Sequence, residues 1–124
     1  NLEFHEADVR DRAAVRDAVA EADVIFHFAA QVAVTTSLDD PLADFGVNAA
    51  GTLNVLEAAR VSPRRPTMLF TSTNKVYGAL DSVELARCGS RYEPVDRQLA
   101  VKGAGETMPL SFHSPYGCSK GAAN

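Results

Sequence analysis

The sequence predicts an α/β fold built on a parallel sheet. Segments with the pattern of strands and segments with helical periodicity alternate three times along the chain, which is typical of right-handed crossovers between parallel strands. One apolar run, DVIFHFAA in residues 23–30, has the length of a strand buried inside such a sheet. Two pairs, Asp40-Pro41 and Ser114-Pro115, have the chemistry of helix starts, in which a capping side chain precedes a proline at the first helical position.

The first strand and the first helix are predicted in residues 2–22. LEFHEADV, residues 2–9, has the pattern of a short strand with Leu2 and Phe4 facing inward. DRAAVRDAVAEA follows, and Asp11 can cap it as a helix. Four apolar residues of this segment share one helical stripe: Ala14, Val15, Ala18 and Val19.

A second helix and a third strand are predicted after the run of residues 23–30. The helix begins at Pro41, with Asp40 as its cap, and ends near Arg60. PTMLFTST, residues 66–73, is the third strand, and it ends in hydroxyl residues.

The last part of the chain combines a long connection with a final helix. Residues 77–113 carry scattered glycine, proline and charge, and so long a connection more often serves function than scaffold. The final helix opens at Pro115 after the cap Ser114.

The composition is that of an ordinary globular domain, or part of one, with 124 residues and 46% apolar residues. A net charge of -4 argues against nonspecific binding to nucleic acid. No window approaches the roughly 18 apolar residues of a membrane-spanning helix. Cys88 and Cys118 match neither a metal-ligand spacing nor a disulfide framework, which predicts reduced thiols in a cytoplasmic protein.

Tyr116 and Lys120 are the first candidate pair for chemistry. They lie four residues apart, so both side chains project from one face of the final helix. An ammonium close to a phenol favours the phenolate, which can accept a proton from a sugar or alcohol hydroxyl near neutral pH. The spacing alone also fits a surface lysine whose stem packs on a tyrosine ring.

A second candidate site is the end of the third strand, in FTSTNKVYG. Thr71, Ser72 and Thr73 place hydroxyls at the carboxyl edge of a parallel sheet, where ligands of open α/β sheets bind. The strand propensity of threonine and the turn propensity of the polar residues explain the same letters without a ligand.

Three further positions need an explanation. Ala29 and Ala30, just past the second strand, let a flat ligand approach the backbone or let a helix pack tightly. Asn48 is a poor residue for a helix interior, so it is expected to bond to a neighbouring strand, for structure or to hold ligand-binding loops. Asp8 can accept a hydrogen bond from an adenine amino group or can cap a loop or helix.

Together these elements, in this order, resemble an extended short-chain dehydrogenase/reductase of the NAD-dependent epimerase/dehydratase family, over essentially the whole chain. The resemblance implies a Rossmann-like doubly wound sheet whose third, fourth and fifth strands correspond to the three predicted here. It also implies that Tyr116 is the general base, that Lys120 binds the nicotinamide ribose and favours the phenolate, and that Thr73 hydrogen-bonds the reacting hydroxyl.

The resemblance assigns cofactor contacts as well, with NAD as the cofactor. By this assignment Asp8 and Val9 flank the adenine, and Asn48 supports the active-site loops. The other residues assigned to NAD are Phe28, Ala29, Ala30, Gln31 and Ser72, together with Tyr116 and Lys120. The residue after the second strand of the family's sheet, which separates NAD from NADP, is not in this sequence.

Two motifs, TSTNKVYG and PLSFHSPYGCSKGAA, narrow the resemblance to the branch that epimerises CDP-linked deoxysugars at C2. This implies transfer of a hydride from C2 to NAD, a transient ketone, and return of the hydride to the opposite face. Dehydratases of the family carry Thr-Asp-Glu where this chain has Thr73-Asn74-Lys75. Asn74 does not titrate and Lys75 is a cation, so neither replaces a carboxylate pair. Lys75 can contact a sugar hydroxyl or phosphate, or be a solvated loop lysine.

Other functions of the same scaffold stay open. A nucleotide-sugar 4-epimerase, a 4,6-dehydratase and a reductase share these motifs, and a family member can also serve as a sensor or structural subunit that only binds NAD. An intact set of Thr73, Tyr116 and Lys120 favours an enzyme, because a binding module has no need of proton transfer.

The glycine-rich phosphate loop of dinucleotide-binding folds is absent from the 124 residues. We therefore expect residues 1–124 to be an incomplete NAD-binding domain, an internal fragment without the glycine-rich part and the C-terminal substrate domain. The isolated fragment should be inactive, bind NAD poorly and be marginally stable. The resemblance implies a homodimer for the full-length protein.

Overall fold

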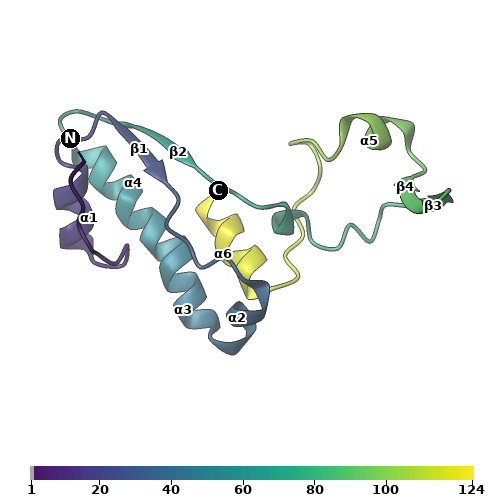
Figure 1. Cartoon of the computed structure of the whole chain (residues 1–124), viewed down its shortest axis with the longest axis horizontal. Coiled ribbons are helices and arrows are strands. Elements are labelled where there is room, and N and C mark those ends of the chain that lie inside the picture. Colours follow the sequence, from purple (N-terminus) through teal and green to yellow (C-terminus); the bar gives the residue numbers. More distant parts are fainter. Residues whose placement is uncertain (1) are drawn as a thin grey trace.

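Two parallel strands, β1 (Val24–His27) and β2 (Thr67–Phe70), form the central sheet of this computed structural model, which describes residues 2–124 (Figure 1). The register pairs Val24 with Thr67 and His27 with Phe70. Helices connect the two strands, as a parallel pair requires. The predicted α/β class with a parallel sheet is confirmed.

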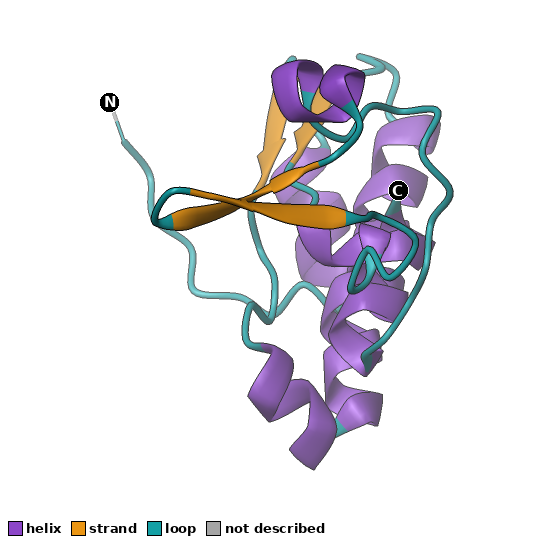
Figure 2. Ribbon diagram, turned by 90° about the vertical axis from the view of Figure 1, so that its right-hand side faces the viewer, coloured by secondary structure: helices purple, strands orange, loops and turns teal. Residues whose placement is uncertain are grey.

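The helices pack beside one another along this sheet (Figures 1 and 2). The helix α1 (Arg12–Val19) lies against α4 (Gly51–Val61), and α6 (Pro115–Ala123) lies against α3 (Pro41–Phe45). A π-helical segment, η1 (Gly46–Ala50), joins α3 to α4 without a break, and the short α2 (Val34–Asp39) precedes them. The predicted helix from Pro41 to about Arg60 is thus present, although its middle turn is π-helical and α2 was not predicted.

The apolar core lies between α1, α4 and the sheet. It consists of Val15, Val19, Val55 and Ala58, with Val9, Ile25, Ala59 and Met68 packed against it. The spacing of four residues in α1 and three in α4 places each pair on one helix face. Burying a valine side chain stabilises a fold by roughly 1.5–3 kcal/mol, so this small cluster is what fixes α1 on α4.

The three predicted helix caps are confirmed. The side chain of Asp11 accepts hydrogen bonds from the backbone N–H groups of Ala13 and Ala14, at 2.9 and 3.2 Å. Asp40 accepts from Ala43 N at 2.9 Å, directly before Pro41. The third cap, at the start of α6, is made by the side chain of Ser114, which accepts from the backbone three residues later.

The strand predicted in residues 2–9 is wrong. This segment has no regular secondary structure and pairs with neither sheet, and Leu2 and Phe4 are 97% and 83% exposed. A strand is held by the hydrogen bonds of a neighbour, and no strand of the described residues lies beside this one. Only its last residue, Val9, packs on the core.

The second strand is present, but it is not buried on both faces. His27 is buried, whereas Phe26 is 64% exposed. Successive side chains of a strand point to opposite faces, and the described helices cover one face of this sheet. The burial therefore alternates along β1.

The long connection leaves the sheet and returns to it. After the 3-10 turn η2 (Asn74–Tyr77) it forms a hairpin of β3 (Leu85–Cys88) and β4 (Arg91–Pro94), followed by α5 (Arg97–Lys102). These elements were not predicted, and they extend to one side of the molecule (Figure 1). Throughout residues 2–124, every helix is too short or too polar to cross a bilayer.

Candidate active site

The candidate pair lies on α6, against the ends of the two central strands. Tyr116 and Lys120 are 8% and 3% exposed. A surface lysine packed on a tyrosine, the alternative that the spacing left open, is therefore excluded for Lys120. Within residues 2–124 no hydrogen bond engages the Tyr116 hydroxyl, whereas the Lys120 ammonium is held by two groups.

The ammonium of Lys120 is held at the end of β2. Its Nζ donates a hydrogen bond to the backbone oxygen of Thr71 at 2.6 Å and lies 4.2 Å from the centre of the Phe70 ring. Burial lowers the pKa of Lys120, because desolvation disfavours the charged form. A carbonyl dipole and the negative face of an aromatic ring are the groups that hold this cation.

His27, at the end of β1, lies behind the lysine. The Thr52 hydroxyl donates its single proton to the backbone oxygen of Asn48 at 2.6 Å, so His27 Nε2 must donate to Thr52 Oγ1 at 2.9 Å. Burial, followed by the charge of Lys120, lowers the pKa of His27. The imidazole is therefore neutral at pH 7.

Asn48 connects three segments of the site. Its Oδ1 accepts a hydrogen bond from the backbone N–H of Gln31 at 2.9 Å. Its Nδ2 donates to Ser119 Oγ at 3.0 Å and to Asp44 Oδ1 at 3.2 Å. The side chain is 1% exposed and lies in the π-helical segment η1, a form that recurs at functional sites. The predicted bond to a strand is wrong: Asn48 bonds to the loop after β1 and to two helices, because the helix passes beside the strand end and not beside the strand itself.

Three buried polar residues that anchor α6 were missed from the sequence. Ser119 Oγ donates to Asp44 Oδ2 or to the backbone oxygen of Tyr116, and Ser37 Oγ accepts from the backbone N–H of Tyr116 at 3.1 Å. The partners of these contacts are 75 and 79 residues apart in the chain. No local pattern signals such a pairing, because each partner on its own is an ordinary helix residue.

Gly117 lets α6 approach the turn η2. A Cβ added at Gly117 would lie 2.9 Å from the backbone oxygen of Lys75, closer than real side chains come. Only a glycine allows this contact between the backbones of the two elements. The turn that follows Thr73 therefore packs directly beside Tyr116.

The residues after β2 line a concavity of about 680 Å³. Its lining brings together Ser72, Thr73 and Asn74 with one carboxylate, Glu106, from the long connection. Lys75 does not line it, because its backbone faces Gly117 and its side chain is exposed. The described residues thus unite Ser72, Thr73 and Asn74 but neither Thr71 nor Lys75, and they add Glu106, which the sequence did not indicate.

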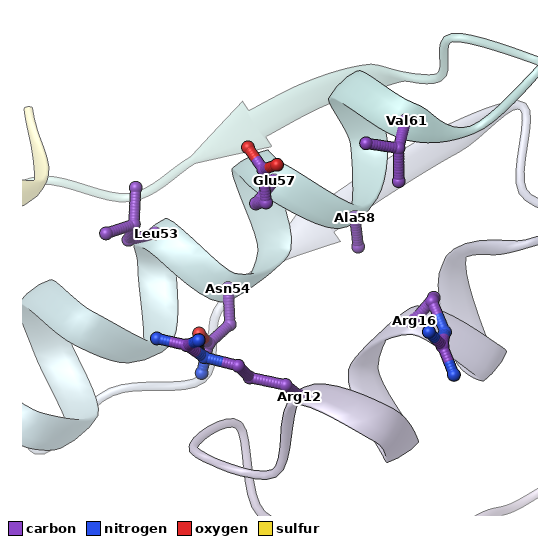
Figure 3. Close-up of a pocket in the computed structure, with 7 residues that line it drawn as sticks. All are labelled: Arg12, Arg16, Leu53, Asn54, Glu57, Ala58 and Val61. Atoms are coloured by element: carbon purple, nitrogen blue, oxygen red, sulfur yellow. Dashed lines mark hydrogen bonds between the residues drawn. The ribbon is translucent and has the colours of Figure 1, made fainter.

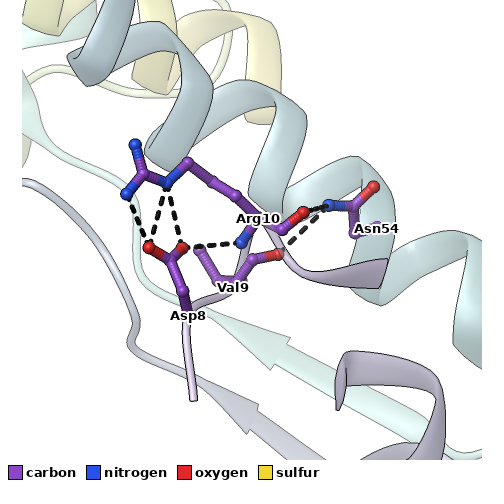
Figure 4. Close-up of polar contacts among 4 residues, drawn as sticks. All are labelled: Asp8, Val9, Arg10 and Asn54. Atoms are coloured by element: carbon purple, nitrogen blue, oxygen red, sulfur yellow. Dashed lines mark hydrogen bonds and ion pairs between the residues drawn. The ribbon is translucent and has the colours of Figure 1, made fainter. Parts of the chain in front are cut away.

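The predicted adenine residues meet in a second concavity, of about 460 Å³. Asp8, Val9 and Ala29 line it, so residues that are 20 apart in the chain form one surface. Asp8 accepts hydrogen bonds from the backbone and guanidinium of Arg10 (Figure 4), which lowers the pKa of Asp8 to about 2. An ionised carboxylate is purely an acceptor, as an adenine amino group requires.

The remaining candidates lie in the segment after β1. Phe28 is exposed, Ala30 is half-buried, and the Gln31 side chain donates to the backbone oxygen of Ala33 at 3.0 Å. Among the described residues, the Oε1 atom of Gln31 is buried without a hydrogen-bond partner. The hydrogen bond to Asn48 fixes the backbone of this segment at Gln31. The small side chains of Ala29 and Ala30 leave its backbone accessible to a ligand.

Comparison with known proteins identifies the family. The family model described as GDP-mannose 4,6 dehydratase matches residues 1–124. CDP-paratose 2-epimerase of Salmonella typhi is 44% identical over 126 residues, covering 100% of this chain and 36% of that protein. A dTDP-glucose 4,6-dehydratase of Mycolicibacterium smegmatis is 35% identical over 119 residues, covering 96% of this chain and 30% of that protein.

A solved structure supports the same assignment. UDP-glucose 4-epimerase of Thermus thermophilus, in complex with NAD, is 34% identical with a TM-score of 0.71, and the match covers 98% of this chain and 34% of that one. The chain thus spans about a third of the length of these relatives, and the Rossmann-like class implied by the resemblance is confirmed. The chain belongs to the NAD-dependent epimerase/dehydratase family of extended short-chain dehydrogenases/reductases.

Proposed function

We propose that this chain carries the proton-transfer residues and part of the cofactor site of an NAD-dependent nucleotide-sugar epimerase. The observation that carries the proposal is the buried ammonium of Lys120, one helical turn from Tyr116 on a helix that packs against the Thr73 turn. A buried cation without a carboxylate partner is costly, so its retention beside a phenol indicates chemistry.

The residues fit NAD at the adenine end. The concavity at Asp8, Val9 and Ala29, which Glu6 also lines, combines carboxylate acceptors with small and apolar walls, which suits an aminopurine. The buried, unpartnered Oε1 of Gln31 offers a further acceptor on the predicted NAD path. We assign Phe28, Ala30 and Ser72 to the same path as the family pattern implies.

In the proposed reaction Thr73 hydrogen-bonds the reacting hydroxyl of the sugar and orients it, and Tyr116 accepts its proton. We assign Lys120 to the nicotinamide ribose, as the family pattern implies, with its ammonium held at the end of β2. Bound NAD would supply the hydride acceptor and donor for the sugar carbon. Asn48 holds the Gln31 loop against α6, so the cofactor wall and the catalytic helix keep one geometry.

The substrate we propose is a CDP-linked deoxysugar, epimerised at C2. The 44% identity to CDP-paratose 2-epimerase supports this choice, and Asn74 and Lys75 stand where dehydratases carry two carboxylates. Glu106 supplies a single carboxylate to the concavity, from a different element. The alternative is another reaction of the family, because a dehydratase is also 35% identical.

Tyr116→Phe in the complete protein tests the proposal. Removal of the phenol should lower turnover of the CDP-sugar by about 10²–10⁴-fold, the usual contribution of a positioned acid or base. NAD affinity, measured by calorimetry, should stay within about threefold, roughly 0.7 kcal/mol. Unchanged turnover would refute the role of Tyr116, and an NAD-binding protein without turnover in the wild type would favour the sensor or structural subunit.

The product separates the enzymatic alternatives. The proposed epimerase returns its hydride, so the C2 epimer should form with no net change in NAD. Release of a 4-keto-6-deoxy sugar would instead identify a dehydratase, and inversion at C4 a 4-epimerase. Stoichiometric consumption of NAD(P)H would identify a reductase.

We further propose that residues 1–124 are part of an NAD-binding domain whose glycine-rich and substrate-binding parts belong to the length that the relatives have beyond this match. The cytoplasmic location and the homodimer are proposals on the same footing. The whole chain matches only about a third of the length of each relative, which supports this arrangement.

A further inference from the structure

The segment of residues 8–10 is held by α4 rather than by a sheet. It follows residues that pair with no strand, yet it carries two of the proposed adenine contacts. Asn54 of α4 reaches this segment, and its Nδ2 donates hydrogen bonds to the backbone oxygens of Val9 at 3.1 Å and Arg10 at 3.3 Å (Figure 4). Two consecutive carbonyls are thus fixed by one side chain.

Both the oxygen and the nitrogen of the Asn54 amide make hydrogen bonds. Its Oδ1 accepts a hydrogen bond from Arg12 Nε at 3.1 Å, at the start of α1. Arg12 reaches toward Asn54 at one end of a hollow of about 370 Å³ between α1 and α4 (Figure 3). Because carbonyls only accept and a guanidinium only donates, the orientation of the Asn54 amide is determined.

Gly51, three residues earlier on α4, forms with Asn54 the surface on which residues 8–10 pack, which we call the seat. A Cβ added at Gly51 would lie 2.5 Å from Cγ1 of Val9, so the Val9 side chain occupies the space that the glycine leaves. Residues three apart lie on one helix face, so Gly51 and Asn54 present a single surface. This surface fixes both the side chain and the carbonyl of Val9.

Asp8 is tied to the same seat. The backbone N–H of Asp11 donates a hydrogen bond to the backbone oxygen of Asp8 at 2.9 Å. The Asp8 carboxylate pairs with the guanidinium of Arg10, and the backbone oxygen of Arg10 accepts a hydrogen bond from Asn54. We propose that Asn54 and Gly51 are positioning residues for the adenine end of the dinucleotide: they fix the Asp8–Arg10 segment without touching the ligand. The inference rests on the proposed function, because that proposal supplies the adenine contact.

The test compares NAD with nicotinamide hypoxanthine dinucleotide, in which the adenine amino group is replaced by oxygen. Wild-type complete protein should prefer NAD, because the ionised Asp8 accepts from the amino group. Asn54→Asp keeps the size of the side chain and removes its N–H donors. The variant should bind NAD about tenfold more weakly and lose most of the preference, and each tenfold corresponds to about 1.4 kcal/mol.

Two further variants control for folding. Glu57 is exposed on the same helix and contacts Arg60 and not residues 8–10. Glu57→Gly lowers helix stability but should leave the preference for NAD over the hypoxanthine analogue unchanged. Gly51→Ala perturbs the seat through Val9 alone and should reproduce the loss of preference. Circular dichroism and thermal melts of all variants show which of them are folded at the temperature of the titration.

The outcomes separate this inference from the proposed function. No NAD binding by the wild type would overturn both. Binding of NAD without a preference over the hypoxanthine analogue would overturn the inference, because residues 8–10 would then not face the amino group. A preference that survives in folded Asn54→Asp and Gly51→Ala would overturn the positioning role and leave NAD binding intact.

Discussion

Two buried titratable side chains meet at the ends of the central strands: His27 belongs to β1, and Lys120 of α6 reaches the backbone oxygen of Thr71 after β2. Burial depresses the pKa of both, but the lysine starts from 10.5 and the histidine from 6.5. The imidazole is therefore neutral at pH 7. The neutral His27 serves as a hydrogen-bond donor that holds Thr52, and through Thr52 the backbone of Asn48.

The pKa of His27 predicts a loss of stability in mild acid. Its folded pKa lies below 6.5, so the unfolded chain binds a proton first as the pH falls. The contribution of neutral His27 to the free energy of unfolding is fully present above about pH 6.5 and is lost below that pH, by at most about 1.4 kcal/mol per pH unit for one proton. In the complete protein, His27→Gln should reduce the fall in melting temperature between pH 7 and 5.

His5→Gln provides the matched control. His5 is an exposed histidine near an exposed glutamate, so its replacement should leave the pH dependence of the melting temperature as it is. An equal fall in wild type and His27→Gln would show that other groups cause the acid sensitivity.

Sequence reasoning at this scale finds residues that stand out locally. Tyr116 and Lys120 are marked by their spacing, and Asn48 is marked because it is out of place in a helix. Asp44, Ser37 and Ser119 are as buried as Asn48 but were not found, since their partners lie in distant parts of the chain. Residues whose chemistry is local are predictable, and residues whose role is a tertiary contact are not.

At the scale of elements, the site depends on how closely α6 approaches η2. Gly117 is the residue that sets this distance, because its missing side chain leaves room for the backbone oxygen of Lys75. The Ser37 and Asp44 contacts hold the opposite side of α6. The helix α6 is therefore fixed between η2 on one side and the residues Ser37 and Asp44 on the other. A displacement of either side moves Tyr116.

Gly117→Ala should displace α6 from the turn that follows Thr73. A displacement of about 1 Å can lower turnover by about 100-fold, because proton transfer requires close alignment. NAD affinity should change less, since the proposed adenine contacts lie on a different segment. Turnover and NAD titration of the complete protein measure the two effects.

Cys118→Ala is the control for Gly117→Ala, since Cys118 is the next residue of α6 and is exposed. It should retain wild-type turnover. A Gly117→Ala variant with the same turnover as Cys118→Ala would mean that η2 yields to the added methyl group and that the close approach is not required.

The elements were predictable to different degrees for physical reasons. The starts at Asp40-Pro41 and Ser114-Pro115 are encoded in adjacent residues, and both were found. The strand predicted in residues 2–9 has the right pattern, but a strand forms only beside a partner. The π-helical turn η1 was not found, because its shift to a wider hydrogen-bond pattern carries no simple sequence signature.

At the scale of the whole molecule, the central sheet has two strands and a partly uncovered face. Phe26 and Phe28 are exposed beside each other, with ring centres 6.0 Å apart, and Val24 and Leu69 are exposed on the same two-stranded sheet. A sheet of two strands is marginally stable in water, and each of its outer edges presents unpaired backbone groups.

The 124-residue chain, produced alone, should therefore self-associate and melt over a broad range. Light scattering should show species larger than the 13.2 kDa monomer, and their share should rise with concentration. The complete protein under the same conditions is the control and should melt sharply. A monomeric chain with a sharp, cooperative melt would contradict this expectation.

The long connection between η2 and α6 leaves and rejoins the molecule at one place. The backbone N–H of Ser111 donates to Val76 at 2.9 Å, and Gly78 lies against Ser111 and His113. The hairpin and α5 between these points pair with each other and make no strand pairing with the central sheet. Because the connection is closed at its base, changes in the length or side chains of the hairpin and α5 should leave the packing of η2 against α6 in place. Glu106 lies within this connection, so a substitution there would alter the lining of the concavity after β2 without changing the strand end that carries Ser72 and Thr73.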